Sequence, residues 1–122
     1  MNKQARFKKR IAAERLGKRA EWLAALSLLL KGYRIVQRRY KTKSGEIDII
    51  ARKGDLVAMV EVKARPTVQE AVDAVSTTSQ HRIHNAADLW LCKQRDAERL
   101  SIRFDVIAIC PRRWPVHFED AF

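Results

Sequence analysis

The stretch GEIDIIARKGDLVAMVEVKAR, residues 45–65, decides the fold because it consists of two apolar-rich runs on either side of a turn. Both runs contain many β-branched residues, and the segment Lys53-Gly54-Asp55 separates them. These features predict a β-hairpin with arms of about seven or eight residues. The turn residues favour a four-residue loop over 52–55, which we take as the working register.

Side chains along a strand alternate between its two faces, so the register decides which polar residues meet. In the first arm, one face is expected to carry Asp48 and Ile50, and the other Ile47, Ile49 and Ala51. In the second arm, Glu61 and Lys63 are i, i+2 neighbours on one face. A loop of two or four residues places Asp48 opposite Glu61 or Met59, on the same face as Lys63. A loop of three or five residues would send Asp48 to the other face.

Two carboxylates and an ammonium group on one half-buried face are costly to retain without a partner. A divalent cation relieves the repulsion between Asp48 and Glu61, and Mg²⁺ binds to oxygen ligands from one or two carboxylates together with substrate phosphate. Lys63 adds a positive charge that can orient an attacking water or neutralise charge on a phosphate. The alternative is a solvated strand face on which Lys63 forms salt bridges with both acids, and the hairpin by itself leaves that alternative open.

Composition indicates the class of partner. The 122 residues suffice for one domain with an ordinary core, and their net charge is +11 with a pI near 10.3. A chain this basic favours a polyanion, with nucleic acid as the first candidate and an anionic membrane surface as the second. Cys92 and Cys110 stand apart in apolar surroundings, so we interpret both as reduced core thiols of a cytoplasmic protein. The longest apolar run, residues 22–30, is too short to span a bilayer, so no membrane partner is expected.

The N-terminal third predicts an arm and a long helix. Residues 1–10 are basic and contain no acid, which predicts a flexible arm ahead of a domain over 11–122. From about Ile11 the apolar spacing is helical, and Lys31-Gly32 ends the helix. Its second half, residues 22–30, is apolar nearly all round and is therefore expected to be buried on several sides.

The remaining elements complete a sheet with helices. We expect a strand over 33–40, the hairpin, a helix capped by Thr67 with Glu70, a second helix capped by Ser76 or Thr77 and ending near residue 94, a strand over 102–110 and a short edge strand over 116–118. This order predicts a single-domain α/β fold with a mixed sheet and helices on both sides.

Several basic or polar residues outside the hairpin are candidate phosphate contacts. They form one cluster around the end of the first strand and another near a helix N-terminus, where anions are favoured: Arg38, Arg39, Lys41 and Lys43, then Gln80 and Arg82. Charge alone does not separate such contacts from a solvated loop. Two acids have simpler interpretations, with Glu21 pairing with Lys18 or Arg19 at the surface, and Asp105 lying at an exposed strand end or pairing with Arg103.

Four short segments together resemble the YraN-type family of small bacterial proteins: residues 17–21, Gly45-Glu46-Ile47-Asp48, Glu61-Val62-Lys63 and Arg103-Phe104-Asp105-Val106. That family is similar to archaeal Holliday-junction resolvases and to the restriction-endonuclease-like PD-(D/E)xK nucleases. The resemblance covers roughly residues 14–122. It implies a restriction-endonuclease-like fold and a metal-dependent nuclease that hydrolyses phosphodiester bonds in structure-selective DNA.

Position by position, the resemblance implies that Asp48 and Glu61 bind Mg²⁺ or Mn²⁺ and that Lys63 is the catalytic lysine. It implies that Glu21 reaches the site from the helix, which replaces its interpretation as a surface residue. Gln80 matches a polar position near the phosphate. The chain departs from the pattern at Ser79, where we expect a lysine, and after residue 65, where a usual glycine is missing.

Three classes of function remain in competition. The first is the nuclease, and the complete set of Asp48, Glu61 and Lys63 favours it. The second is a nucleic-acid-binding protein with the nuclease fold but no useful turnover. The third is an assembly factor or a membrane-surface protein that uses the basic N-terminus. A homodimer is also expected, because a two-fold junction suits two sites.

Overall fold

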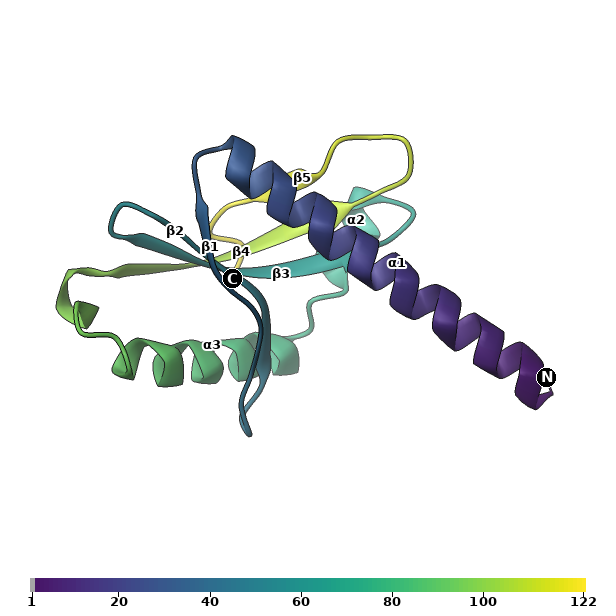
Figure 1. Cartoon of the computed structure of the whole chain (residues 1–122), viewed down its shortest axis with the longest axis horizontal. Helices are drawn as coiled ribbons and strands as arrows, with labels where there is room; N and C mark the ends of the chain where they lie inside the picture. Colours follow the sequence, from purple (N-terminus) through teal and green to yellow (C-terminus); the bar gives the residue numbers. More distant parts are fainter. Residues whose placement is uncertain (1) are drawn as a thin grey trace.

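A computed structural model describes residues 2–122, apart from the side chains of residues 13 and 14. In chain order its elements are α1 (Lys3–Leu30), β1 (Arg34–Lys41), β2 (Glu46–Lys53), β3 (Leu56–Ala64), α2 (Val68–Asp73), α3 (Thr77–Cys92), the 3₁₀ turn η1 (Ala97–Arg99), β4 (Ser101–Ile109) and β5 (Val116–Phe118). The main helices and strands occur in the predicted order (Figure 1).

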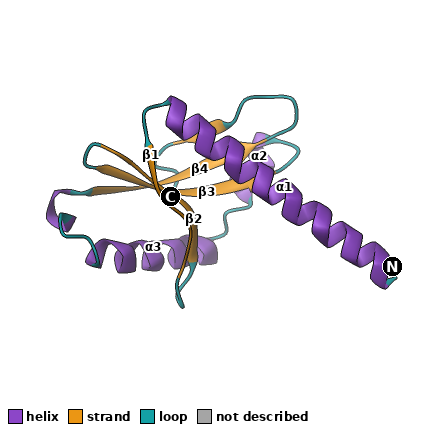
Figure 2. Ribbon diagram, in the orientation of Figure 1, coloured by secondary structure: helices purple, strands orange, loops and turns teal. Residues whose placement is uncertain are grey.

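The five strands form one sheet in the order β1-β2-β3-β4-β5 (Figure 2). β3 and β4 are parallel, because the chain crosses over through α2 and α3 between them, and the other neighbours are antiparallel. The sheet is therefore mixed and flanked by helices, as predicted. This single-domain α/β architecture is compatible with the restriction-endonuclease-like fold.

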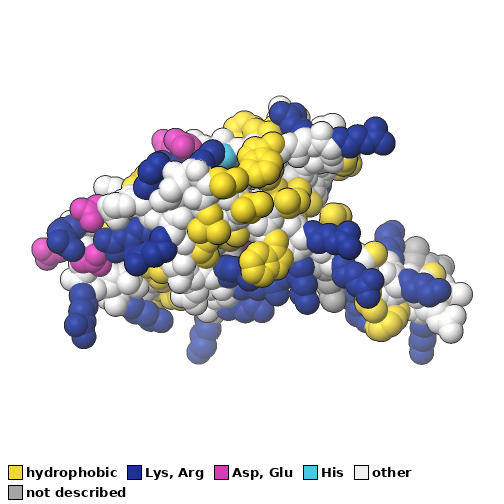
Figure 3. Space-filling view, turned by 45° about the horizontal axis from the view of Figure 1, so that its top comes forward, with side chains coloured by type: hydrophobic (Ala, Val, Ile, Leu, Met, Phe, Trp, Pro, Cys, Tyr) yellow, Lys and Arg dark blue, Asp and Glu magenta, His cyan; other side chains and the backbone are white. Residues whose placement is uncertain are grey.

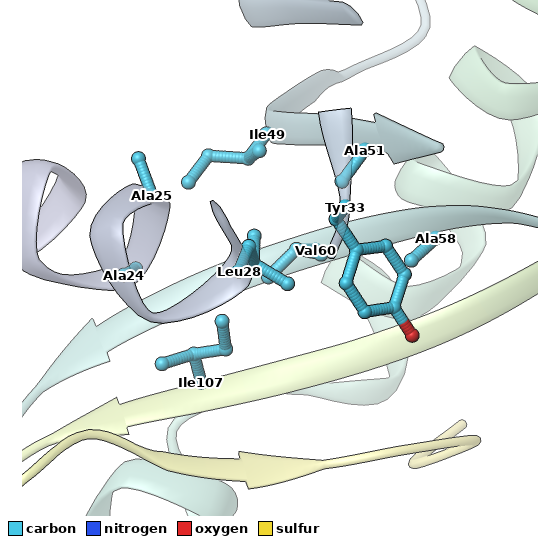
Figure 4. Packing of buried hydrophobic residues seen from close by; sticks show 9 residues of the cluster. All are labelled: Ala24, Ala25, Leu28, Tyr33, Ile49, Ala51, Ala58, Val60 and Ile107. Atoms are coloured by element: carbon cyan, nitrogen blue, oxygen red, sulfur yellow. The ribbon is translucent and has the colours of Figure 1, made fainter. Parts of the chain in front are cut away.

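Each face of the sheet is covered by a different helix. Figure 4 shows Ala24, Ala25 and Leu28 of α1 packed towards residues of β2, β3 and β4 that include Ile49, Val60 and Ile107. On the opposite face, α3 packs through Ile83, Ala86, Ala87 and Trp90 against Ile47, Ile50, Val57 and Met59. Two buried faces explain why β2 and β3 are apolar over most of their length.

Local sequence signals set the helix ends. Gly32 has φ +91°, and the amide of Tyr33 donates to the carbonyl of Leu28, which is a Schellman ending of α1. Thr67 accepts a hydrogen bond from the backbone of Glu70 at the start of α2, as predicted.

The hairpin turn is shorter than the working register. Lys53 pairs with Leu56, so the loop contains two residues, Gly54 and Asp55, and the prediction of a four-residue loop over 52–55 is wrong. Gly54 has φ +63°, a conformation that glycine adopts without strain and that two-residue hairpin loops require. A change of two residues in loop length does not alter which faces of the two arms meet, so Asp48 still lies beside Glu61.

The expected alternation fails at one point in β2. Ile47 packs on the α3 side together with Ile50, whereas Ile49 packs on the α1 side. The prediction that Ile47 shares a face with Ile49 is therefore wrong. The neighbouring strand β1 bends at Arg39, which has φ +52°, and directs Tyr40 into the same α3-side core as its partner Ile47. The sheet thus bends just where Asp48 lies.

Helix α1 is longer and less covered than its sequence indicates. It begins at Lys3 rather than near Ile11, after an Asn2 cap, and its first turns project away from the sheet (Figure 1). Whether residues 1–10 move as an arm stays a prediction. None of the described helices combines the length and the apolar composition needed to cross a membrane.

The second half of α1 is not buried on several sides, which corrects the prediction for residues 22–30. Only one side of the helix contacts the sheet, so the other side leaves Trp22 62% exposed and Leu30 70% exposed. Figure 3 shows hydrophobic side chains gathered on this side of the molecule, with Lys and Arg around them. Cys92, at the end of α3, is also exposed, so only Cys110 is a core thiol.

Candidate active site

One pocket of about 340 Å³ brings together the four residues that the sequence singles out as catalytic. Asp48 comes from β2, Glu61 and Lys63 come from β3, and Glu21 comes from α1. The remaining lining residues are Leu16, Gly17, Ala20, Val62, Ala64 and Arg65. Segments that are far apart in the sequence therefore converge where α1 crosses the ends of β2 and β3.

The hairpin places Asp48 and Glu61 opposite each other. The last paired residues are Ile49 and Val60, so the next positions in the same register are Asp48 and Glu61. The pairing of β2 with β3 ends here, and the backbone N–H of Val62 instead donates to Oδ2 of Asp48 over 2.9 Å. This hydrogen bond fixes the orientation of the aspartate carboxylate at the open end of the strand pair.

The environment of Glu61 disfavours its charged form. Burial raises the pKa of Glu61 to about 9, with further contributions from a hydrogen bond to Asp48 and from the charge of Asp48. Glu46 adds to the upward pKa shift of Glu61, and Lys63 opposes it. At neutral pH the protonated, uncharged form of Glu61 is therefore favoured.

Lys63 faces the pocket without neutralising either acid directly. Among the described side chains it has no carboxylate oxygen within the 4.0 Å of an ion pair. The alternative of a solvated face with satisfied salt bridges is therefore not what the structure contains. The ammonium group remains available to a substrate phosphate or to a water.

Glu21 lies in the pocket but is bound by arginines. Nε of Arg39 donates to Oε2 of Glu21 over 3.0 Å, and Nη2 of Arg38 donates to the same oxygen over 3.4 Å. The interpretation as a partner of Lys18 or Arg19 is wrong, because the bend in β1 brings Arg38 and Arg39 to the helix instead. Arg38 also lies over the ring of Trp22, 4.5 Å from its centroid. Arg38 and Arg39, predicted to contact nucleic acid, are thus occupied by a carboxylate.

The donor set fits a hard divalent cation. Among the described side chains, which leave out those of residues 13 and 14, no group of three or more His, Cys, Asp or Glu is arranged to hold a metal. The pocket instead offers two carboxyl groups, Asp48 and Glu61, whose mutual proximity disfavours a second negative charge. Mg²⁺ commonly engages one or two carboxylates and completes its shell with water and phosphate, whereas zinc sites use His and Cys.

A second hollow of about 350 Å³ lies on the other side of Glu61 and contains predicted phosphate contacts. Its lining includes Lys41 and Arg82, together with Glu46, which sequence reasoning left without a role. Gly45 lets the loop between β1 and β2 come close to α3, since a Cβ there would lie 2.6 Å from the carbonyl oxygen of Arg82. The glycine of the GEID motif therefore lets the loop pack against α3, and it is the signal that could have located this hollow.

The other predicted contacts are less central. Gln80 donates through Nε2 to the carbonyl of Val75 over 3.3 Å and lines neither hollow. Lys43 is exposed in the loop between β1 and β2. Ser79, where we expect a lysine, lines the second hollow and its hydroxyl is hydrogen-bonded to Ser76. Roles for Gln80 and Lys43 at phosphate stay predictions.

Asp105 belongs to a separate, satisfied cluster. It pairs with Arg103 as predicted, through bonds of 2.7 and 2.8 Å, but it is completely buried rather than at an exposed strand end. Nε2 of His117 lies 2.7 Å from Oδ2, and the amide of Asp120 donates to Oδ1 over 3.0 Å. Burial alone would raise the pKa of Asp105, but these hydrogen bonds lower it to about 2.

Comparison with known proteins places the chain in a family. The model of the family described as "Uncharacterised protein family UPF0102" matches residues 20–109, which include the whole acidic site. The UPF0102 protein of Chelativorans sp. (strain BNC1) is 60% identical over 122 residues, covering 100% of this chain and 98% of that protein. The UPF0102 protein of Agrobacterium fabrum (strain C58 / ATCC 33970) is 62% identical over 114 residues, covering 93% of each chain. The chain therefore belongs to the UPF0102 family, the YraN-type family that its motifs indicate.

Proposed function

We propose that this protein is a metal-dependent nuclease that hydrolyses phosphodiester bonds, with structure-selective DNA as its substrate. The observation that carries the proposal is the convergence of Asp48, Glu61, Lys63 and Glu21 in one pocket. A net charge of +11 supports a polyanionic substrate. A carboxyl group in a cleft with a strongly raised pKa, as at Glu61, is also a physical mark of functional sites.

In this proposal Asp48 and Glu61 hold Mg²⁺ or Mn²⁺, which supplies polarisation of the phosphate and a more acidic water. Asp48 is already oriented for this by the Val62 amide. Glu61 must release its proton before it can act as a ligand. Lys63 stabilises the negative charge that develops on the phosphate or orients the attacking water.

Basic residues around the pocket position the substrate. Lys41 and Arg82 lie beside Glu61 in the second hollow, so a phosphate backbone can run past the acidic pair. Such contacts fix the position of a nucleic acid and do not read its sequence. Arg38 and Arg39 would contact phosphate only in exchange for Glu21, which makes their contribution depend on release of that ion pair.

The proposal includes a homodimer in the cytoplasm, because a branched DNA with two-fold symmetry suits two sites. The exposed apolar side of α1, with Trp22 and Leu30, offers a surface for such a contact. Sedimentation at several protein concentrations tests this part, and a strictly monomeric chain in the presence of four-way DNA would contradict it.

The test of the proposed activity is cleavage of linear, flapped and four-way DNA with Mg²⁺ or Mn²⁺. Asp48→Ala should lower the rate by roughly 100-fold or more, since it removes a ligand of an ion worth several kcal/mol in the transition state. Asp55→Ala, which removes an exposed acid from the hairpin turn, is the matched control and should leave the rate unchanged. Activity that survives Asp48→Ala would remove the site from consideration.

Nucleic-acid binding without turnover is the competing proposal, and the ion pairs of Glu21 with Arg38 and Arg39 favour it, because they occupy its carboxylate. It predicts affinity for DNA with no metal-dependent cleavage of any substrate. In both proposals log affinity should fall with log salt by about 0.9 for each phosphate neutralised. A flat salt response would argue against a polyanionic partner of either kind.

A further inference from the structure

A third hollow, which we call the arginine hollow, adjoins the acidic pocket. Its volume is about 600 Å³, and it lies between α1, the end of β3 and the segment after β4. It shares part of its lining with the acidic pocket, namely Leu16, Ala20, Ala64 and Arg65. A ligand can therefore extend from one into the other without leaving the surface.

The arginine hollow combines an apolar floor with a cationic rim. The floor includes Leu23, Pro66, Ile109 and Pro111, and the rim is formed by Arg19, Arg65, Arg112 and Arg113. No acidic residue is among the described residues that line it. Among the side chains that the structure describes, none of these four arginines has a carboxylate partner within 4.0 Å. The hollow therefore presents apolar surface and uncompensated positive charge to the same ligand.

We propose that the arginine hollow binds an unpaired nucleotide of the substrate, next to the pocket of Asp48 and Glu61 where the phosphodiester would be cleaved; this rests on the proposed function. A nucleotide matches both parts of the lining, because its base is flat and largely apolar while its phosphate is anionic. Bases bind single-strand sites by stacking on side chains and on arginine planes, with the backbone in a positive groove. An isolated anion would leave the leucine and proline floor bare.

The loop that closes the hollow is held in a defined shape. Arg112 has φ +61°, which a non-glycine residue keeps only where the surroundings hold it. Leu23 in the apolar floor is 42% exposed, so a base can contact it directly. The consequence is a preference for DNA with a flap, an overhang or a single-stranded end, because a base inside a continuous duplex is already stacked.

The experiment measures binding by fluorescence anisotropy in EDTA, so that no metal-dependent cleavage occurs. Three DNAs are compared: a blunt duplex, the same duplex with a short overhang, and the overhang with abasic sites. The wild-type protein should bind the intact overhang about 10-fold more tightly than the blunt duplex, the factor expected for one stacked base. The abasic overhang should lose most of this advantage.

Single substitutions test whether the preference for an overhang depends on the arginine hollow. Leu23→Gln should abolish the preference for the intact overhang, whereas Leu29→Gln, which changes another exposed leucine of α1 outside the hollow, should retain it. Arg113→Ala should weaken overhang binding more than Arg95→Ala, an exposed arginine beyond the end of α3. All four positions are exposed, so circular dichroism should show folded proteins.

Equal affinity for blunt and overhanging DNA would overturn the inference, as would a preference that survives Leu23→Gln. Binding of anionic vesicles that is lost in Leu23→Gln, without any preference among DNAs, would assign the hollow to a membrane instead. The outcomes also separate the two proposals. Overhang preference without cleavage refutes the nuclease and retains the hollow, and cleavage without preference refutes only the hollow.

Discussion

Two acidic sites in the sheet differ in how their charge is compensated. Asp105 in β4 is completely buried, yet Arg103, His117 and a backbone amide surround it with hydrogen-bond donors, and its pKa falls to about 2. Glu61 in β3 is less buried, yet its nearest polar neighbour is another acid, and its pKa rises to about 9.

The difference teaches that burial of an acid does not by itself indicate a function. The cluster at Asp105 is complete without any ligand and links β4 to the C-terminal segment, so it stabilises the fold. In the pair of Asp48 and Glu61, by contrast, no cationic side chain compensates the two acids, which costs stability and supports the proposal that this pair is the functional site. Substitutions at the two sites should therefore differ in their effect on stability and on metal binding.

Asp105→Asn should destabilise the protein by about 3–5 kcal/mol, because removal of one partner leaves the guanidinium of Arg103 without its buried counter-charge. Urea unfolding at pH 7 measures the change, and Asp55→Asn at the exposed hairpin turn is the control. Because the pKa of Asp105 is lowered, its contribution is present above its ordinary value of 3.8 and is lost as the pH falls towards 2. A variant as stable as wild type would remove the contrast.

Addition of Mg²⁺ at pH 8 should stabilise the wild-type protein by up to about 2.7 kcal/mol at a concentration 100 times the dissociation constant. Glu61→Gln and Asp48→Ala should respond much less, because each lacks one carboxylate of the pair. Thermal melts with NaCl at matched ionic strength provide the control. A shift of the same size in Asp48→Ala would mean that the ion binds elsewhere.

Glu61→Gln should stabilise the metal-free protein at pH 8, by roughly 1–2 kcal/mol or several °C. The unfolded chain releases this proton near pH 4.5 and the folded chain near pH 9, so the stability of the wild type falls as the pH rises between these values. The amide imitates the protonated acid and removes that dependence. Melting curves in EDTA from pH 4 to pH 9 measure the difference, and parallel profiles would show that Glu61 is not the titrating group.

Glu21→Gln should cost only about 0.2–1 kcal/mol, although Glu21 is also bound by two arginines. Unlike the pair at Asp105, both arginines are partly exposed, with side-chain exposures of 34% and 42%. The small loss should shrink further at high salt. A loss as large as that of Asp105→Asn would place Glu21 among the structural acids and not at the edge of the functional site.

Much of the fold and the site could be predicted because the signals are local. Turn, cap and β-branched residues predict the helices and strands. A hairpin loop of either two or four residues places Asp48 on the same face as Glu61 and Lys63. The length itself could not be chosen, since Gly54 suits more than one loop. The packing of Ile47 on the α3 side of the sheet could not be predicted either, because it accompanies a bend in the neighbouring strand at Arg39.

Burial along α1 was misjudged for a similar reason. An apolar run such as residues 22–30 indicates burial on several sides only if several elements surround it, and here one sheet face is the main contact. The sequence could not show that the opposite side would remain open. It also could not show that Arg38 and Arg39, read as phosphate contacts, would reach Glu21 first.

The amino-acid sequence alone indicated the order of elements, the mixed sheet and the two acids and the lysine of the hairpin, because these depend on periodicity, capping and short spacings along the chain. Only the tertiary structure decided which acids are satisfied. Compensation of a buried charge depends on donors from distant segments, such as His117 for Asp105 and Arg39 for Glu21, and no local pattern records their distance.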